Sequence, residues 1–279
     1  MKPRFFSVLP VLAAAMFFCG IFSSVARSAE AAPPAMYIMA HQDDEIFIIA
    51  KIALDARNGR ETHVLWVTDG SGTASPEARE KESRNAMKLA GVPDENLHFL
   101  GYQDRYSYKN LDAIYADVMK IAEKLQPSEI TTDAYEGGNI DHDVTSLIGS
   151  MVAARLASKP AHYEFPLYNM YNKTYRAGKF LPRGDSPTLI TGLDDELAAI
   201  KLRSLDMYPT QAAIINMIKA VTNKKKIMKD GEIYRVSPKY DYTKRPVEEP
   251  LNYEVNSLTP VLFDEWLSYV EPFIKKTRR

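Results

Sequence analysis

Five consecutive residues, His41-Gln-Asp-Asp-Glu45, bring one imidazole and three carboxylates into a short stretch of the chain. His41 and Asp44 can approach one divalent cation while Asp43 points at a water beside it. A catalytic cation takes about three protein ligands and keeps a position open, so a third ligand must come from elsewhere. The best candidate is His142, which follows a Gly-Gly turn. Nitrogen and oxygen donors suit zinc first, with iron, cobalt or manganese also compatible.

Both segments come directly after short apolar runs that are typical of buried parallel strands. We expect strands at 36–40, 62–68, 96–100, 129–132 and 162–168, and helices at 46–57, 75–90, 111–125 and 144–157. This alternation predicts an α/β fold with a Rossmann-like, mostly parallel sheet and helices on both faces. Ligands of such sheets bind outside the carboxyl ends of the strands, where His41 and His142 fall.

The other histidines are weaker ligand candidates, because the pattern places His63, His98 and His162 at the start of strands or within them. Beyond residue 170 the pattern weakens. Helices are expected at 194–204, 211–223 and 263–275, the lysine run at 224–226 is typical of a solvated helix end, and 229–260 is rich in Tyr, Pro and charge. We therefore expect one catalytic domain over 29–223 and an irregular C-terminal extension of the same domain over 224–279.

Residues 1–28 have the pattern of a signal peptide: Lys2 and Arg4 precede an apolar run, and small residues follow it. The alternative is a retained membrane anchor, which the short run disfavours. Cleavage would remove Arg27 and the only cysteine, Cys19, leaving 32 basic and 36 acidic residues and a formal charge of −4. We expect an exported protein, periplasmic or secreted and of bacterial type, with no stable membrane insertion after cleavage and no nucleic-acid partner.

Several motifs in the right order resemble those of a known family. Ala40-His-Gln-Asp-Asp-Glu45 is similar to Ala-His-Pro-Asp-Asp-Glu, and Asn139-Ile-Asp-His142 is similar to His-x-Asp-His. Both are hallmarks of the PIG-L, or LmbE-like, family of zinc-dependent N-acetylglucosaminyl deacetylases. Further likenesses lie at 67–70, 79–92, 99–104 and 201–211, so the resemblance covers residues 36–215. Ordered motifs are more specific together than any one is alone.

The resemblance implies a role for each matching residue of the two main motifs. His41, Asp44 and His142 would be the zinc ligands, and Asp43 would be the general base that activates water. The alternative for Asp43 is a structural role as an N-cap carboxylate alone. Asp141 would orient a ligand or the base.

The resemblance also predicts roles for two residues outside those motifs. Arg79 and Asp104 match family positions near the sugar, where a guanidinium and a carboxylate can hold vicinal hydroxyls. The alternative for both is an ordinary surface ion pair or cap. Glu45, the last residue of the first motif, lies inside the expected first helical turn, where it would interact with the helix dipole or hold a hydrogen bond around the site.

Two residues depart from the family pattern. Gln42 replaces the usual proline, which removes rigidity from the turn but no chemical group. Asn139 replaces a histidine to which the family resemblance assigns the stabilisation of an oxyanion or protonation of the amine. An amide can donate a hydrogen bond to an oxyanion but cannot supply a proton near neutral pH.

The resemblance implies an exported metal-dependent hydrolase that removes acetyl groups from N-acetylglucosamine-type sugars or glycoconjugates. One alternative is a metal-dependent amidase that acts on a non-sugar acyl amine. A second alternative, motivated by Asn139, is a catalytically weakened member of the family that binds glycans. The implied partners are zinc and an N-acetylated sugar or glycan, and no feature of the sequence indicates an oligomeric state.

Overall fold

The computed structural model describes residues 32–277. The expected signal peptide at 1–28, with Cys19, lies outside the described residues. These described residues belong to one compact unit. None of the helices between residues 32 and 277 combines the length and the apolar character that crossing a bilayer requires.

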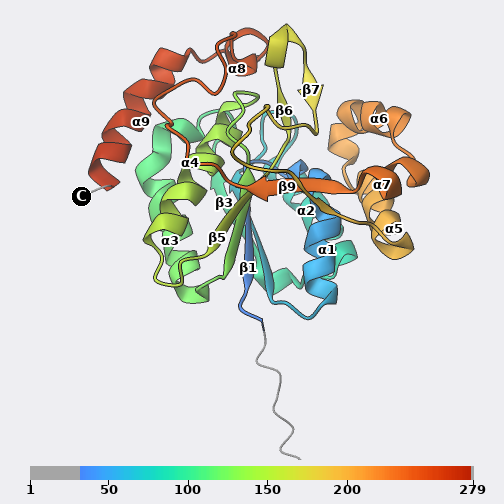
Figure 1. The fold of residues 1–279 in the computed structure, drawn as a ribbon. Helices are drawn as coiled ribbons and strands as arrows, with labels where there is room; N and C mark the ends of the chain where they lie inside the picture. Colours follow the sequence, from blue (N-terminus) through green and yellow to red (C-terminus); the bar gives the residue numbers. More distant parts are fainter. Residues whose placement is uncertain (1–31, 278–279) are drawn as a thin grey trace, which may run out of the picture. The chain divides into compact units, whose positions relative to one another are not determined.

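A seven-stranded sheet in the order β3-β2-β1-β4-β5-β9-β8 forms the centre of this unit (Figure 1). The parallel strands are β1 (Ala35–Met39), β2 (Thr62–Thr68), β3 (Leu97–Tyr102), β4 (Glu129–Asp133) and β5 (Ala161–Phe165). Two strands, β9 (Glu232–Val236) and β8 (Leu189–Thr191), continue the sheet in antiparallel pairing. Every residue of β1 and β2 is buried, which explains why these strands appear in the sequence as continuous apolar runs.

Helices cover both faces of the sheet (Figure 1). One face carries α1 (Ile49–Arg57), α2 (Pro76–Ala90) and α5 (Asp195–Ser204), and the other carries α3 (Leu111–Leu125), α4 (Ile140–Arg155) and α9 (Phe263–Thr277). The alternating side chains of β1 belong to both layers. Met36 and Ile38 join the apolar cluster beneath α3, α4 and α9, whereas Tyr37 and Met39 join the cluster beneath α1, α2 and α5. The expected α/β fold is confirmed.

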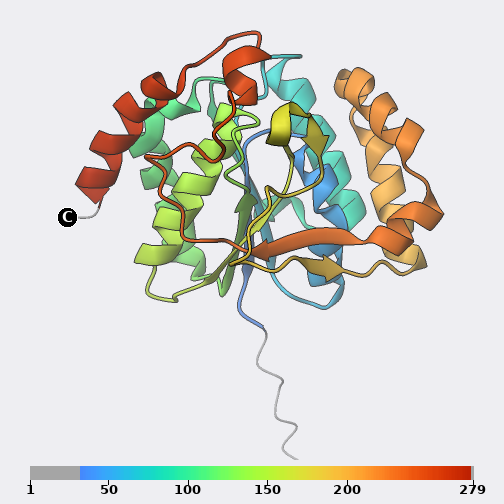
Figure 2. The same ribbon diagram turned by 45° about the horizontal axis from the view of Figure 1, so that its top comes forward.

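The carboxyl ends of the parallel strands lie at the top of Figure 1, and Figure 2 turns this end toward the viewer. Shorter elements gather there and beside α5, namely β6 (Tyr168–Asn169), β7 (Arg176–Ala177), α6 (Ala212–Val221), α7 (Lys224–Asp230) and α8 (Asn252–Val255). From β1 the chain crosses to β2 on one side, and from β4 it crosses to β5 on the other. The carboxyl ends of β1 and β4 therefore flank the topological switch point, where α/β sheets bind ligands.

Helix α4 begins earlier than the apolar pattern predicts, and this moves two candidate site residues, Asp141 and His142, onto a helix. It starts at Ile140 rather than at 144, because the side chain of Asn139 accepts a hydrogen bond from the backbone N–H of Asp141 and caps the helix. His142 therefore lies in the first turn of α4 instead of in a loop. The signal for this start is an asparagine followed by acidic residues in the first turn.

The C-terminal region expected to be irregular contains a stretch of regular structure, at residues 224–236. The lysine run at 224–226 begins α7, which Asn223 caps, instead of ending the preceding helix. The chain then returns as β9, whose first residue, Glu232, is buried at the start of α1. Its carboxylate accepts hydrogen bonds from the backbone N–H groups of Ala50 and Lys51, so the extension is bound to the helix that follows the turn with His41 and Asp44.

Candidate metal and catalytic site

Three side chains of the metal-ligand type converge at the carboxyl ends of β1 and β4. His41 Nδ1 lies 3.1 Å from His142 Nε2. Asp44 reaches both rings, with Oδ1 3.3 Å from His142 Nε2 and Oδ2 3.4 Å from His41 Nδ1. All three side chains are buried. His41 and Asp44 come from the turn after β1, and His142 comes from α4, so crossovers on opposite faces of the sheet meet at this point.

The donor set fits a divalent cation in both geometry and charge. Ligand atoms about 2.0 Å from a tetrahedral zinc ion stand about 3.3 Å apart, close to the three observed separations. Burial alone would lower the pKa of His41, but the carboxylates of Asp104 and Asp44 hold it well above its usual range. Burial would raise the pKa of Asp44, but the imidazoles of His142 and His41 hold it well below its usual range. A buried cluster that attracts a proton this strongly is suited to bind a metal ion in its place.

The second ring nitrogen of His41 faces two further carboxylates. Nε2 lies 3.2 Å from Asp141 Oδ2 and 3.3 Å from Asp104 Oδ1. Asp141 is fully buried and accepts hydrogen bonds from the backbone N–H groups of Arg105 and Ser107. A carboxylate on the far nitrogen fixes the tautomer and the orientation of a ligating histidine. The structure thus places Asp141 against the candidate ligand His41 rather than against Asp43, and it brings Asp104 to the same ring.

Asp43 adopts a strained backbone conformation beside the ligands. Its φ of 145° lies in a region that residues with side chains rarely adopt. The Asp43 N–H donates to Glu45 Oε2 at 2.9 Å, and the fully buried Glu45 also accepts hydrogen bonds from Trp66 Nε1 and the Tyr208 hydroxyl. Glu45 thereby holds the turn. The Asp43 side chain makes no capping hydrogen bond to the helical turn that follows and instead lines the cavity above the ligands.

Arg79 contacts the candidate base. Its Nη2 donates to Asp43 Oδ1 at 3.0 Å, and only 3% of the Arg79 side chain is exposed. Burial raises the pKa of Asp43 to about 7, even though the guanidinium of Arg79 acts in the opposite direction. The structure therefore places Arg79 against Asp43, where its charge favours the ionised carboxylate.

Tyr168 lies next to the ligands and had no assigned role in the sequence. Its ring is edge-on to that of His142, with centroids 5.3 Å apart, and it shares the cavity lining with Asn139. Gly138 permits this approach, because a Cβ there would lie 1.9 Å from the carbonyl oxygen of Tyr168. Burial holds the pKa of Tyr168 well above its usual range, so its hydroxyl remains a hydrogen-bond donor. The only signal in the sequence is its position as the last residue of the strand expected at 162–168.

Two buried polar residues beneath the site were also not predicted as functional. Asp133, the last residue of β4, accepts hydrogen bonds from the backbone N–H of Ala40 and from the Thr145 hydroxyl, and so ties the end of β1 to α4. Gln42 donates through Nε2 to the carbonyl oxygen of Thr68 at 2.8 Å. This hydrogen bond anchors the turn and offsets the loss of rigidity that results from the absence of a proline.

A polar cavity of about 340 Å³ opens above these groups. Its volume is within the range of small-molecule sites. The lining residues are His41, Asp43, Asp44, Thr73, Arg79, Asp104, Arg105, Asn139, His142, Tyr168, Thr210, Gln211, Ala213 and Ile214. Every site residue expected from the sequence lines this cavity except Asp141, which contacts His41 instead.

The remaining histidines lie outside the site. His63 Nδ1 lies 3.1 Å from His98 Nε2, and His162 Nε2 lies 3.0 Å from the Thr132 hydroxyl. Burial lowers the pKa of His98 and of His162 to about 4, so both rings are neutral near pH 7. These contacts show that the three histidines pack against neighbouring side chains of the sheet.

Residues 36–153 match the family model described as PIG-L: GlcNAc-PI de-N-acetylase. The matched span runs from β1 to α4 and contains the three candidate ligands and Asp43. It ends before 201–211, so the likeness noted in that segment lies outside the match. A search of curated proteins gave no match.

Several solved structures share the fold at low sequence identity. A deacetylase of the teicoplanin biosynthesis pathway, solved as a bog complex, gives a TM-score of 0.59 at 16% identity over 72% of this chain and 96% of that chain. The N,N'-diacetylchitobiose deacetylase of Pyrococcus horikoshii gives 0.52 at 18% identity, over 83% and 89%. The 4-carboxy-2-hydroxymuconate hydratase of Pseudomonas putida gives 0.51 at 15% identity, over 75% and 98%. Because a hydratase shares this fold with deacetylases, activity has to be argued from the site.

Proposed function

Residues 36–153 belong to the PIG-L family, and from this premise we propose that the chain is a metal-dependent hydrolase that removes acetyl groups from N-acetylglucosamine-type sugars or glycoconjugates. The observation that carries the proposal is the buried cluster of His41, Asp44 and His142 with the Asp43 carboxylate beside it in a polar cavity. The deacetylases among the structural neighbours support it. Zinc as the metal, and export directed by residues 1–28, are parts of the same proposal.

When bound, a divalent ion supplies a Lewis acid that polarises an amide carbonyl and makes water more acidic. His41, Asp44 and His142 would hold this ion, and Asp141 would keep the His41 ring in place. Asp43 takes a proton from the attacking water and returns it to the leaving amine as the C–N bond breaks. The products are acetate and the free amine.

The polar groups around Asp43 set its protonation state and the position of the sugar. Arg79 favours the ionised form of Asp43, the form that accepts a proton. We therefore assign Arg79 chiefly to the base, and sugar contacts to Asp104, Arg105 and Gln211, which line the same cavity. Their charged and amide groups can pair with vicinal hydroxyls.

Acetate release from the zinc-loaded mature protein, residues 29–279, tests the proposed function. We expect one acetate and one primary amine per turnover from N-acetylglucosamine and its glycosides, measured by two independent assays. N-acetylcyclohexylamine is a matched amide without hydroxyls. Faster hydrolysis of that compound would replace the proposal with a general amidase. Binding of the sugar without hydrolysis would replace it with a glycan-binding role.

Tyr168 supplies a donor that compensates for Asn139 in this mechanism. Its neutral hydroxyl lines the cavity and can hydrogen-bond to the amide oxygen as that atom gains charge. We expect Tyr168→Phe to lower kcat by about 10²-fold, with little change in KM, because a single oxyanion donor typically contributes this much. The measurement is steady-state amine release. Tyr175→Phe is the matched control, because Tyr175 packs against Tyr168 but does not line the polar cavity. Equal rates for Tyr168→Phe and the wild type would remove Tyr168 from the mechanism.

A further inference from the structure

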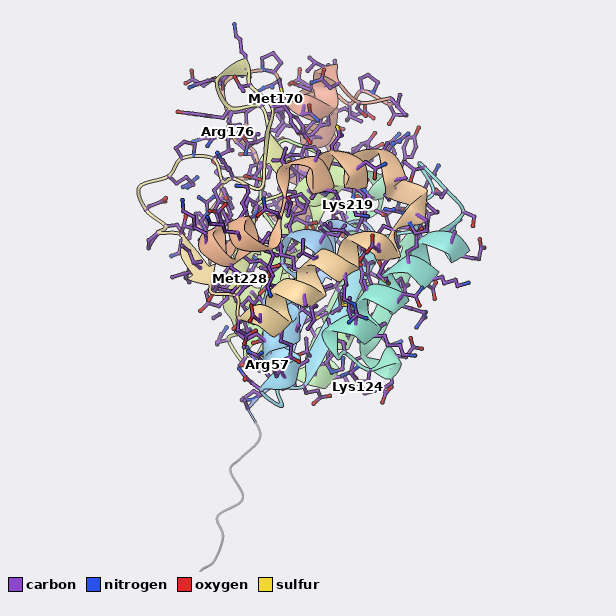
Figure 3. The ribbon with its side chains drawn as sticks, turned by 90° about the vertical axis from the view of Figure 1, so that its right-hand side faces the viewer. Arg57, Lys124, Met170, Arg176, Lys219 and Met228 are labelled. Carbon is purple, nitrogen blue, oxygen red and sulfur yellow. The ribbon has the colours of Figure 1, made fainter. Side chains whose placement is uncertain are left out.

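A second cavity, of about 320 Å³, lies on the other side of the catalytic carboxylates. It is bounded by the turn after β1, the β6–β7 segment and α6. Figure 3 views the molecule from the α6 side and shows the segment with Met170 and Arg176 next to the helix that carries Lys219, in agreement with Figure 1. The walls of the cavity are apolar and include Phe47, Leu167, Ala177, Ile215, Ile218 and Val221.

This apolar cavity is continuous with the polar one. Asp43, Asp44, Tyr168 and Ile214 line both cavities. The two cavities therefore meet where the reacting amide must lie, within reach of the candidate base and of a metal ligand. One side offers guanidinium, carboxylate and amide groups, and the other offers hydrocarbon.

The carbonyl carbon of an amide carries two substituents, and the two cavities differ in what they can bind. A sugar amine fits the polar side, because its hydroxyls need hydrogen-bond partners. The acyl group must then extend toward the apolar side. A methyl group would occupy only a small part of a cavity of about 320 Å³. Apolar side chains at its rim, Met217 and Val221, are 64% and 67% exposed, a contact surface that a hydrocarbon chain would cover.

We propose that the apolar cavity binds the N-acyl chain of the substrate and that the enzyme prefers linear aliphatic acyl groups longer than acetyl. The inference rests on the proposed hydrolase function and specifies its substrate class. Water adds to the carbonyl carbon, the C–N bond breaks, and the products are a fatty carboxylate and a free amino sugar. Each buried methylene strengthens binding by up to about fourfold, which corresponds to about 0.8 kcal/mol.

A series of N-acylglucosamines from acetyl to octanoyl, kept below micelle-forming concentrations, tests the inference by amine release. We expect kcat/KM to rise by at least about 100-fold from acetyl to octanoyl. Met217→Asp places a charge at the cavity rim and should abolish most of this rise. Leu262→Asp is the matched control, because Leu262 is also 64% exposed and lines neither cavity. The control should keep the full chain-length dependence.

A flat or falling dependence on chain length, with the acetyl compound cleaved, would overturn the inference and leave the proposed function intact. Octyl N-acetylglucosaminide, which carries its hydrocarbon chain on the sugar instead of on the acyl group, provides a further test. If this compound is cleaved faster than N-acetylglucosamine and Met217→Asp removes the difference, the cavity binds the aglycone and the inference is overturned. Calorimetric binding of octanoate and acetate to the zinc-loaded protein needs no turnover. If octanoate binds no more tightly than acetate, the inference fails even if no compound is cleaved. Tighter octanoate binding without any cleavage would contradict the proposed hydrolysis instead and, with it, the preference in turnover.

Discussion

We expect Asp43→Asn to lower kcat for amide hydrolysis by about 10²- to 10⁴-fold and to leave the metal content unchanged. The amide of asparagine keeps the size of the side chain but cannot accept a proton, so water attacks without a general base. The loss falls on kcat rather than on KM, because Asp43 acts on the attacking water and not on the sugar. Steady-state amine release together with metal analysis of the same preparation measures both quantities.

The pH profile of the wild type gives a second measurement for Asp43. Burial raises the pKa of Asp43 to about 7, while Arg79 and any bound dication act in the opposite direction. The carboxylate is the form of Asp43 that accepts a proton. We therefore expect kcat/KM to fall on the acidic side of the pH profile, with an apparent pKa of about 7 or lower. Asp112→Asn, on the exposed surface of α3, is the matched control and should keep both the rate and this apparent pKa. Full activity in Asp43→Asn would show that another group is the base.

His142→Ala should remove the metal and with it the activity. The substitution takes away one of three mutually contacting ligand atoms and leaves Asp44 and His41, which is fewer than the three protein ligands that catalytic zinc sites use. We expect zinc affinity and kcat each to fall by at least about 100-fold, a larger loss than the 10- to 100-fold typical of residues that only orient ligands. Metal analysis after dialysis and amine release provide the test.

Chelation and a control variant distinguish this effect from unfolding. Treatment of the wild type with a chelator should abolish activity, and added zinc should restore it, whereas added zinc should not restore His142→Ala. His98→Ala removes a histidine that lies outside the site and packs against His63, so it should keep both its metal and its activity. Persistent activity in the chelated wild type would count against a metal-dependent mechanism of any kind.

The strand-end rule explains how much of the site can be inferred from sequence. His41 and His142 are 101 residues apart, but each follows a parallel strand, and β1 and β4 are neighbours in the sheet. The rule brings them to one edge without any knowledge of side-chain contacts. The helices and parallel strands themselves could be predicted from hydrophobic periodicity, because buried strands and amphipathic helices leave strong local patterns in the sequence.

Contacts that depend on how helices and loops pack could not be inferred in this way. Arg79 on α2 contacts Asp43 in the turn after β1, and nothing local to Arg79 in the sequence indicates whether it faces a sugar or a carboxylate. Tyr168 becomes part of the site because β6 approaches the loop at Gly138. Strand β9 is short, carries charged residues and follows a lysine-rich helix, so its sequence alone does not distinguish it from a loop.

The carboxylate of Glu232 has a consequence for the order in which the molecule can assemble. Helix α1 follows directly on the turn with His41 and Asp43, yet the backbone N–H groups of Ala50 and Lys51 at its start are satisfied by a residue 182 and 181 positions later. Until β9 has been synthesised, the amino end of α1 lacks these buried acceptors. The start of α1 therefore gains these contacts only after β9 has formed, and contacts of such long sequence separation slow folding.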